Sequence, residues 1–497
     1  MKKNSGVPQE IELKFELEPA HFGQILSHPL VTGRSASAAE TKRLRSTYFD
    51  TPDHDLRQAG VSLRVRSDRD ASIQTIKAAE SGAGVALGRS EWEQAVSSEQ
   101  PDFSAAAGTA LEPFLALSDT IRPVFEVTAH RTLVALRYDS SVVELALDMG
   151  EIQTSGGSHP FAELELELRQ GRRADLFEIA GQLSDTMPLR LSFKTKSERG
   201  YEAISRGSER RIKAEPIVLK KKMTSSAAFI SIGASCLRHL MANESIVRAD
   251  RDPDAVHQMR VAIRRLRAAI SLFKNVAADE RRDAIRSELK WMADQLGQAR
   301  DLDLEPAKAA HGDAPEFANL LSEHQEHRKR AYDMVQEMIT SPRFLRGVLD
   351  TATWIETGSW RSLEGDRGQR VVELAAAELS RRWKRVRKGG KRLAELTTEE
   401  RHQVRIEIKK LRYASEFFGS LFKQGAAKKH HRQAMASLEA LQDVLGDLND
   451  IAVGADMSPS SAIVAISEAN ASRSDELIEA LLKRYRTFSK LELFWEN

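Results

Sequence analysis

The sequence predicts an α+β protein in which a mainly antiparallel, closed or strongly curved β-sheet is followed by an all-α helical bundle. Three observations support this prediction. Up to about residue 200, apolar and polar residues alternate with the period of two that is typical of β-strands. From about residue 225 onward, apolar residues recur at the spacing of an amphipathic helix. Two motifs of the helical half occur twice in the same order, which indicates a duplicated helical unit.

The first predicted strand, residues 10–18, shows the alternation most clearly. Its sequence EIELKFELE puts four carboxylates and one ammonium on one parity, and four apolar side chains on the other. The charged residues are Glu10, Glu12, Lys14, Glu16 and Glu18. We expect Glu16 and Glu18 to lie near the strand end and to be solvated. The other predicted strands span residues 61–67, 72–77, 90–96, 124–137, 142–148 and 161–169, with helices near 19–27 and 174–184.

The helical half begins after a segment that lacks a clean period. Residues 206–224 combine charge and a proline, and we interpret them as a linker between a domain at 1–205 and a domain at 225–497. In the second domain, one apolar stripe with 3-4-3-4 spacing predicts a long helix. The stripe consists of Val256, Met259, Ile263, Leu266 and Ile270. Long helices joined by short breaks are typical of a helical bundle.

The composition is that of a globular protein with more than one domain. The chain has 497 residues, of which 41% are hydrophobic and 29% are charged. We find no apolar run of about 18 residues and no apolar segment after Met1, so we expect neither a membrane partner nor secretion. Cys236 is the only cysteine, which excludes intramolecular disulfides and zinc–cysteine sites. A cytoplasmic location is therefore expected.

The charge of the two halves differs in sign. Residues 1–219 hold 27 Lys and Arg against 32 Asp and Glu, whereas residues 220–497 hold 47 against 40. The second half is therefore the one expected to attract anions.

Several other predicted strands also carry their charges on a single parity. These residues are Arg64, Arg66, Lys77, Glu91, Glu93, Arg131, Glu144, Asp148, Glu163, Glu165 and Glu167. One interpretation is a sheet with one solvated side. The other is that the charges converge inside a barrel, which requires that they be paired, hydrated or bound to ions. Carboxylates at i and i+2 can hold a hard cation, and arginines at i and i+2 present two guanidinium groups to phosphate.

The charged strands include recognisable motifs. Glu10-x-Glu12-x-Lys14 resembles the ExExK signature of the CYTH domain, the triphosphate tunnel metalloenzyme family. The resemblance continues through YFDTPDHDLRQAGVSLRVR (48–66), the ExE pairs of 163–167 and SFKTKSERGY (192–201), and it covers about residues 8–205. It implies an eight-stranded antiparallel barrel with flanking helices, whose interior is a tunnel for a triphosphate. The charged parity would then face the tunnel.

The resemblance also implies roles for the charged residues. The candidate catalytic residues are Glu10, Glu12, Lys14, Asp148, Glu163 and Glu165. Ligands to Mg²⁺ or Mn²⁺ would come from Glu10, Glu12, Glu163, Glu165 and Glu167, the exact pair in 163–167 being open, and Asp148 would bind metal or orient water. The phosphate-binding residues would be Lys14, Arg64, Arg66, Lys77, Arg131, Lys196 and Arg199, with Lys194 as an alternative to Lys196.

The repeated motif of the helical half places a histidine and three bases on one helix face. HQMRVAIRRLR (257–267) and HQVRIEIKKLR (402–412) share six of eleven positions, and LGQARDLD (296–303) matches LGDLNDIA (445–452). The residues concerned are His257, Arg260, Arg264 and Arg267, and His402, Arg405, Lys409 and Arg412. The alternatives are a solvated basic face, a metal site and a nucleic-acid surface. The spacing of the histidines and carboxylates does not support a metal site. A nucleic-acid surface is not supported either, because no aromatic residues clearly interleave with the bases.

These helices resemble the CHAD domain over about residues 225–490, which implies binding of inorganic polyphosphate along the basic surface. A CYTH–CHAD order is similar to that of bacterial inorganic triphosphatases. The resemblance implies that the chain cleaves tripolyphosphate to pyrophosphate and phosphate, with water attacking in line at a terminal phosphorus. The alternatives are an organic triphosphate such as thiamine triphosphate or ATP, cyclisation of ATP, and a polyphosphate-binding protein without activity. The sequence does not indicate an oligomeric state.

Overall fold

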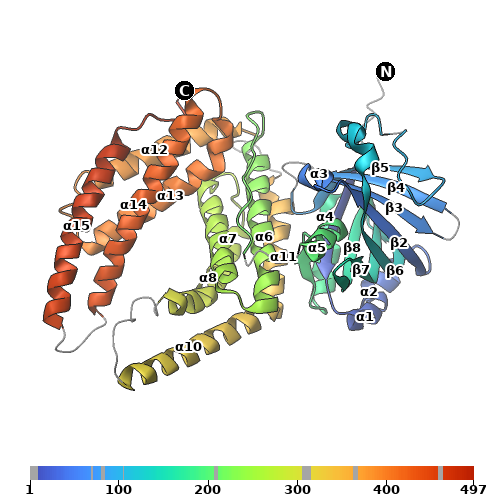
Figure 1. Ribbon diagram of the computed structural model, residues 1–497, viewed down its shortest axis with the longest axis horizontal. Helices are drawn as coiled ribbons and strands as arrows, with labels where there is room; N and C mark the ends of the chain where they lie inside the picture. Colours follow the sequence, from blue (N-terminus) through green and yellow to red (C-terminus); the bar gives the residue numbers. More distant parts are fainter. Residues whose placement is uncertain are drawn as a thin grey trace. The chain divides into compact units, whose positions relative to one another are not determined.

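The computed structural model describes residues 9–68, 71–79, 84–104, 106–205, 211–304, 315–361, 368–456 and 463–496. Within these residues, nine strands form one antiparallel sheet (Figure 1). The strands are β1 (Gln9–Glu16), β2 (Glu40–Asp50), β3 (Val61–Asp68), β4 (Ala71–Ala79), β5 (Leu87–Val96), β6 (Arg122–Tyr138), β7 (Ser141–Thr154), β8 (Gly157–Gln170) and β9 (Arg190–Ser192).

Eight of these strands close into a barrel. The order is β5-β4-β3-β2-β6-β7-β8-β1, and β1 pairs with β5 through Gln9–Glu12, which closes the ring. The short β9 continues the same edge of β1 beyond β5 and pairs with residues 14–16. The predicted fold class is thus confirmed. Strand β2 is absent from the sequence-based prediction because its first half, ETKRLRS, has no apolar alternation.

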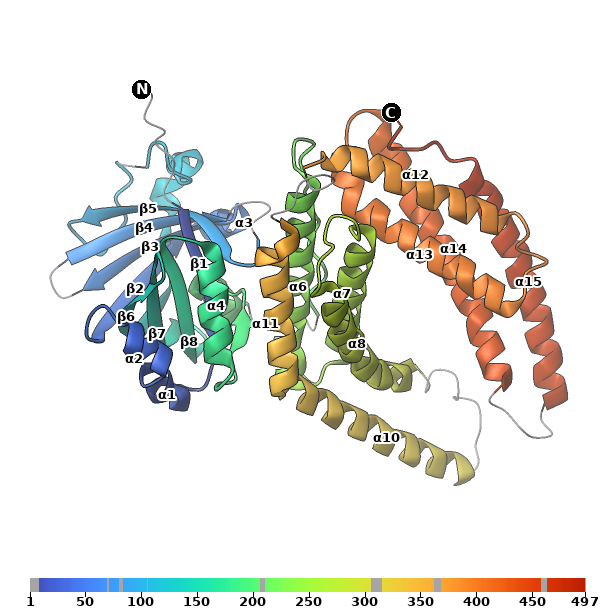
Figure 2. The same ribbon diagram turned by 180° about the vertical axis from the view of Figure 1, so that it is seen from behind.

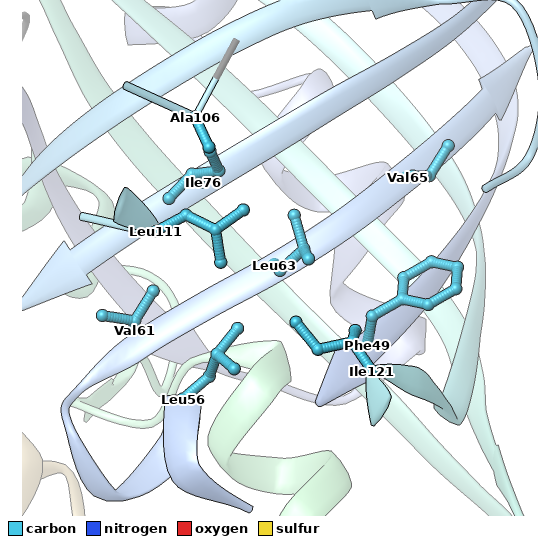
Figure 3. Packing of buried hydrophobic residues seen from close by; sticks show 9 residues of the cluster. All are labelled: Phe49, Leu56, Val61, Leu63, Val65, Ile76, Ala106, Leu111 and Ile121. Atoms are coloured by element: carbon cyan, nitrogen blue, oxygen red, sulfur yellow. The ribbon is translucent and has the colours of Figure 1, made fainter. Parts of the chain in front are cut away.

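Short helices and connections flank the barrel. They are η1 (Pro19–His21), α1 (Phe22–Leu26), α2 (Pro29–Arg34), α3 (Asp55–Gln58), η2 (Glu112–Thr120), α4 (Arg173–Ser184) and α5 (Lys196–Ile204). The apolar side of β1 is buried, and α4 packs against β1 and β8. On the outer surface of β3 and β4, a cluster of apolar side chains fixes these two strands (Figure 3). It comprises Phe49, Leu56, Val61, Leu63, Val65, Ile76, Ala106, Leu111 and Ile121.

One end of the barrel interior is filled by aromatic and aliphatic side chains. Tyr48 and Phe125 stack with ring centroids 4.6 Å apart, and Tyr201 of α5 meets Phe125 edge-on at 5.3 Å. Phe161 and Ile152 complete this cluster. These side chains share the strand parity of Glu163 and Asp148, so they occupy the interior beyond the charged residues. Only the remainder of the interior is left for a polar site.

The helical half consists of longer helices, which Figure 2 shows from the opposite side. They are α6 (Ser225–Asp250), α7 (Pro253–Leu272), α8 (Arg282–Leu304), α10 (Pro315–Thr340), α11 (Pro342–Thr357), η3 (Ser359–Arg361), α12 (Val371–Gly390), α13 (Thr398–Phe418), η4 (Gly419–Leu421), α14 (Ala426–Asp456) and α15 (Ile463–Ser489). No helix within the described residues is long and apolar enough to cross a membrane.

The chain divides into two compact units that do not coincide with the barrel and the helices. The first unit contains Met1–Glu215, Gly233–Arg264 and Asp279–Gly358, and the second contains Pro216–Ile232, Arg265–Ala278 and Ser359–Asn497. The first unit thus joins the barrel to α8, α10, α11 and most of α6 and α7. Of the predicted linker 206–224, residues 206–210 lie outside the described part, and residues 211–223 contain no helix or strand. The domain limits of the sequence analysis stay a prediction.

Within the first unit, buried ion pairs connect the barrel to the helices. Glu356 of α11 accepts a hydrogen bond from the Val85 amide at 3.1 Å and lies 3.1 Å from Arg173 of α4. Glu244 of α6 is 1% exposed and contacts Arg190 of β9. Burial raises the pKa of Glu244 to about 7, although Arg190 opposes this rise.

The buried Glu244 carboxyl should make stability depend on pH. Because its pKa is higher in the folded than in the unfolded state, the folded state binds more protons between about pH 4.5 and 7. As the pH rises through this window, the free energy of unfolding should therefore fall. The contribution of Glu244 to this fall is on the order of 3 kcal/mol. Chemical unfolding at several pH values measures it. Glu244→Gln should remove that contribution, and an unchanged slope in the variant would contradict the assignment.

Candidate active site

The strand register brings the predicted charged residues into the barrel interior. On β1 and β8, Lys14 lies opposite Glu165, and Glu12 lies opposite Glu167. On β6 and β7, Arg131 lies opposite Asp148. Because the side chains of a strand alternate between its two faces, one parity on every strand points inward. The interpretation of converging charges is therefore correct, and the alternative of a solvated sheet face is wrong.

Three carboxylates form a compact cluster in this interior. One oxygen each of Asp148, Glu163 and Glu165 lies within 4.8 Å of the others, and all three side chains are buried. Their negative charge is balanced by bases. Lys196 Nζ lies 2.7 Å from Asp148 and 2.9 Å from Glu165, and it also contacts Glu163. Arg131 lies 2.6 Å from Glu165.

The bases keep two carboxylates of the cluster, Glu165 and Asp148, ionised despite their burial. Burial opposes the charge of Glu165, but the ammonium groups of Lys14 and Lys196 hold its pKa well below the usual range. Burial likewise opposes the charge of Asp148, whose pKa is lowered by Lys196 and Arg131. Both carboxyl groups are therefore available as anionic oxygen donors at neutral pH.

The donor set fits a hard divalent cation. Oxygens of ionised carboxylates are the ligands that Mg²⁺ and Mn²⁺ prefer. Glu163 Oε2 is buried and has no hydrogen-bond partner in the described part of the chain, although Arg199 Nε lies 3.8 Å away. A buried carboxylate oxygen without a partner is costly, and a bound cation would satisfy it. Glu163, Glu165 and Asp148 would hold such an ion.

The other predicted metal ligands lie apart from this cluster and are paired with bases. Glu10 lies 2.6 Å from Lys77, and Glu12 contacts Arg89. Glu12 also lies 3.3 Å from Lys14. Arg89 is missing from the sequence-based set. The signal was present, since Arg89 continues the parity of Glu91 and Glu93 in GRSEWE.

Glu167 also lies outside the three-carboxylate cluster. It is 2.6 Å from Arg169. Burial raises its pKa to about 7, and the neighbouring Glu10 and Glu144 add to the rise while Arg169 opposes it. The geometry thus favours Glu163 and Glu165 as the metal-binding pair of strand β8. The choice among these residues stays a proposal.

A cavity of about 130 Å³ occupies the polar interior. Ten of the predicted site residues line it: Glu10, Glu12, Lys14, Arg64, Arg66, Lys77, Arg131, Glu165, Glu167 and Lys196. Asp148, Glu163 and Arg199 do not line it, but the first two contact Lys196, which does. Arg64 Nε is buried and has no hydrogen-bond partner among the described residues, whereas Arg66 lies 3.5 Å from Glu93. Arg64 is hydrogen-bonded to Tyr48 and lines the cavity, where its guanidinium can face an anion.

Helix α5 explains why Lys196, rather than Lys194, reaches the site. Thr195 and Glu198 form a capping box that starts the helix at Lys196 and aims its ammonium at the carboxylates. Lys194 instead lies 2.9 Å from Glu202, outside the cavity. Arg199 lies 2.8 Å from Glu16, so the expectation that Glu16 is merely solvated is wrong.

Gly200 allows α5 to pack against the barrel. A Cβ atom at this position would lie 2.2 Å from Phe125 Cε2. Gly200→Ala should therefore displace α5 and destabilise the protein by about 1–3 kcal/mol. Thermal unfolding measures this effect. Gly181→Ala in α4 is the control, because no atom would lie within 4 Å of its Cβ. Equal stability of the two variants would contradict the prediction.

In the helical half, the two copies of the repeat make equivalent contacts. The guanidinium of Arg260 lies over Gly297, 3.8 Å from the position of an added Cβ, and that of Arg405 lies over Gly446 at 3.4 Å. Arg260 also lies 3.3 Å from Asp301. These glycines occupy the same place in the two LG motifs, so the sequence repeat is a structural repeat.

The histidines of the two motifs also have equivalent neighbours. His257 lies near Arg300, and His402 Nδ1 lies 3.4 Å from Asn449 Oδ1. Burial, together with Arg300, Arg264 and Arg260, lowers the pKa of His257. Arg264 and Arg267 are exposed on α7, and Lys409 and Arg412 are partly exposed on α13. The continuous basic strip expected from the sequence stays a prediction.

Comparison with known proteins identifies both halves. The CYTH domain model matches residues 8–201, and the CHAD domain model matches residues 231–458. An inorganic triphosphatase of Haemophilus influenzae is 30% identical over 195 residues, which are 39% of this chain and 54% of that protein. The chain thus spans about half the length of this curated relative.

Two solved structures are also similar. The CHAD domain of the plant Ricinus communis has 26% identity and a TM-score of 0.44, covering 56% of this chain and 91% of that one. A putative adenylyl cyclase from Hippeastrum, described as having a dominant triphosphatase activity, has 17% identity and a TM-score of 0.29, covering 39% of this chain and 95% of that one.

Proposed function

We propose that this chain, in which a CYTH domain precedes a CHAD domain, is a metal-dependent inorganic triphosphatase that hydrolyses tripolyphosphate to pyrophosphate and phosphate. The observation that carries the proposal is the barrel interior, in which a cavity lined by many bases and carboxylates adjoins a buried cluster of three carboxylates and shares Glu165 with it. Arg64, Arg66 and Lys77 would bind phosphate oxygens from the walls of the cavity. Lys14 and Lys196, which line the same cavity and contact the carboxylate cluster, would also bind phosphate oxygens.

The reaction requires charge neutralisation and a positioned water molecule. A bound Mg²⁺ or Mn²⁺ would supply part of the neutralisation. The chain's own bases would hold the phosphate oxygens, and the ionised Glu165 could accept a hydrogen bond from the attacking water. The water oxygen would form a bond to a terminal phosphorus while the bridging P–O bond breaks. Pyrophosphate would leave with the bridging oxygen, and the water proton would pass to solvent.

The size of the cavity supports an inorganic substrate. Its volume is about 130 Å³. Pockets for drug-sized ligands are usually about 300–1,000 Å³. A thiamine or nucleoside group would therefore have to remain outside the cavity. The Haemophilus influenzae triphosphatase supports the same substrate class by similarity.

Phosphate release from tripolyphosphate, ATP and thiamine triphosphate tests the proposal when it is measured side by side with Mg²⁺ and with Mn²⁺. We expect tripolyphosphate to have the highest kcat/KM and the activity to disappear with EDTA. The double variant Glu163→Gln/Glu165→Gln, which changes two carboxylates of the cluster, should lose most of it. If ATP or thiamine triphosphate has the highest kcat/KM instead, that compound is the substrate and tripolyphosphate is not. A folded chain without any turnover would leave the polyphosphate-binding alternative.

For the helical half we propose binding of inorganic polyphosphate by the bases of the two repeated motifs. The support is the CHAD match and the equivalent placement of Arg260 and Arg405 in the two copies. Polyphosphate should outcompete RNA of equal phosphate content at matched salt. If RNA instead displaced polyphosphate, the result would favour a nucleic-acid partner.

Binding of polyphosphate should tighten in acid. Since burial and the neighbouring arginines place the pKa of His257 below the ordinary value of 6.5, this histidine is neutral at pH 7 and gains its charge only in more acidic solution. An added positive charge favours a polyanion, so the dissociation constant should fall severalfold between pH 7 and pH 5.5. Calorimetry at both pH values measures it. His257→Gln should reduce this dependence, and a variant with the full wild-type dependence would contradict the role of His257.

A further inference from the structure

The carboxylate of Glu16 connects the candidate active site to the helical half. Glu16 follows Lys14 on the inward parity of β1. Arg199 of α5 donates a hydrogen bond to Glu16 Oε1 at 2.8 Å, and Arg248 of α6 donates one to Glu16 Oε2 at 2.8 Å. The same Arg199 has its Nε atom 3.8 Å from Glu163 Oε2, the partnerless oxygen of the carboxylate cluster.

Helix α6 is held in this place by a second ion pair. Glu244, one turn before Arg248, lies 3.6 Å from the Arg248 Nε atom and contacts Arg190. Arg190 lies opposite Glu16 in the β1–β9 register, and it also donates to the carbonyl oxygen of Ile339 at 3.3 Å. The chain of charges thus runs from the cluster through Arg199 and Glu16 to α6. All of it lies within the first compact unit.

Arg248 has no direct access to the substrate cavity. Its guanidinium does not line that cavity, and Glu16 borders a separate cavity of about 360 Å³ between the barrel and α6. Any effect of Arg248 on the site must therefore pass through Glu16 and Arg199. The positive charge of Arg248 beside Glu16 repels Arg199, so the net attraction that holds Arg199 at Glu16 is smaller than Glu16 alone would exert.

We infer that Arg248 of the helical half is a positioning residue for the tunnel, because its charge offsets that of Glu16 and so leaves Arg199 to balance Glu163, whose other partner Lys196 lines the cavity. The inference rests on the proposed function. Without Arg248, Glu16 would hold Arg199 more strongly, and Glu163 would then draw Lys196 away from the phosphate in the cavity. The expected consequence is weaker substrate binding with little change in the chemical step.

The test uses the full chain with tripolyphosphate and Mg²⁺. Arg248→Met should raise KM about tenfold and change kcat less than about twofold. Arg248→Lys should recover part of the loss. The matched control is Arg346→Met, because Arg346 is a similarly exposed arginine of α11 that contacts Asp185 at the end of α4, and neither residue lines the substrate cavity. Partial unfolding would lower kcat and leave KM unchanged. A change in KM without a change in kcat therefore distinguishes a positioning role from a loss of stability.

A double-mutant cycle with Glu16→Gln gives the second readout. In the Glu16→Gln background, Arg248→Met should have no further effect on KM, because the shared charge is gone. Full additivity, or a KM for Arg248→Met equal to that of Arg346→Met, would overturn the inference.

Calorimetric titration of tripolyphosphate in EDTA repeats the cycle without turnover. If the wild type binds but does not hydrolyse tripolyphosphate, the proposed activity fails while the cycle in Kd still decides the role of Arg248. If it does neither, both proposals fall.

Discussion

Glu163→Gln is expected to lower kcat/KM for tripolyphosphate at least about 100-fold in the full chain. Glu163 is almost fully buried, and its Oε2 atom has no hydrogen-bond partner among the described residues. A glutamine would remove one negative charge and leave a neutral amide, whose carbonyl oxygen attracts a divalent cation much less strongly than a carboxylate does. Lys196 would keep Asp148 and Glu165 as partners, so the fold should be retained.

The control for this variant is Glu126→Gln. Glu126 also lies on a barrel strand, but on the outward parity of β6, where it pairs with the exposed Arg45. It should retain wild-type kcat/KM. Titration of activity with Mn²⁺ should show a higher half-saturating concentration for Glu163→Gln than for the control. Equal metal dependence in the two variants would exclude Glu163 as a ligand.

The barrel interior could be predicted from the sequence because strand parity is a local property. Once Glu12, Lys14, Arg64 and Arg131 are assigned to one parity, a closed sheet forces them to converge. The strand β2 could not be assigned in this way. Its pairing with β3 and β6, and not its own alternation, makes it a strand.

The partner of each charge could not be predicted, because it depends on the shear of the barrel and on contacts distant in sequence. Parity alone does not show that Glu165 faces both Lys14 and Lys196 while Glu167 faces Arg169. Nor does it show that Glu16 binds an arginine more than two hundred positions away. For the same reason the sequence does not show that the boundary between the two compact units passes through α6 and α7. Periodicity marks a helix but gives no information on which helices pack together.

The second large effect concerns the helical half. A variant that replaces four motif bases by glutamine should bind long polyphosphate about 100-fold more weakly, while hydrolysing tripolyphosphate within about twofold of the wild type. The four substitutions are Arg264→Gln, Arg267→Gln, Lys409→Gln and Arg412→Gln. The reason is that each base lost removes one contact to the polyanion and the release of its counterion. The slope of log K against log salt should therefore become shallower by about 0.7 per lost contact, if polyphosphate resembles single-stranded nucleic acid.

The control removes the same number of charges elsewhere in the helices. It replaces Arg286, Lys290, Arg343 and Arg370, which are exposed and paired with acids on the helix surface. If net charge alone governed binding, the two variants would lose equal affinity and equal salt dependence. A loss confined to the motif variant would locate the polyanion on the repeated helices. Impaired tripolyphosphate turnover in the motif variant alone would instead mean that these bases serve the tunnel.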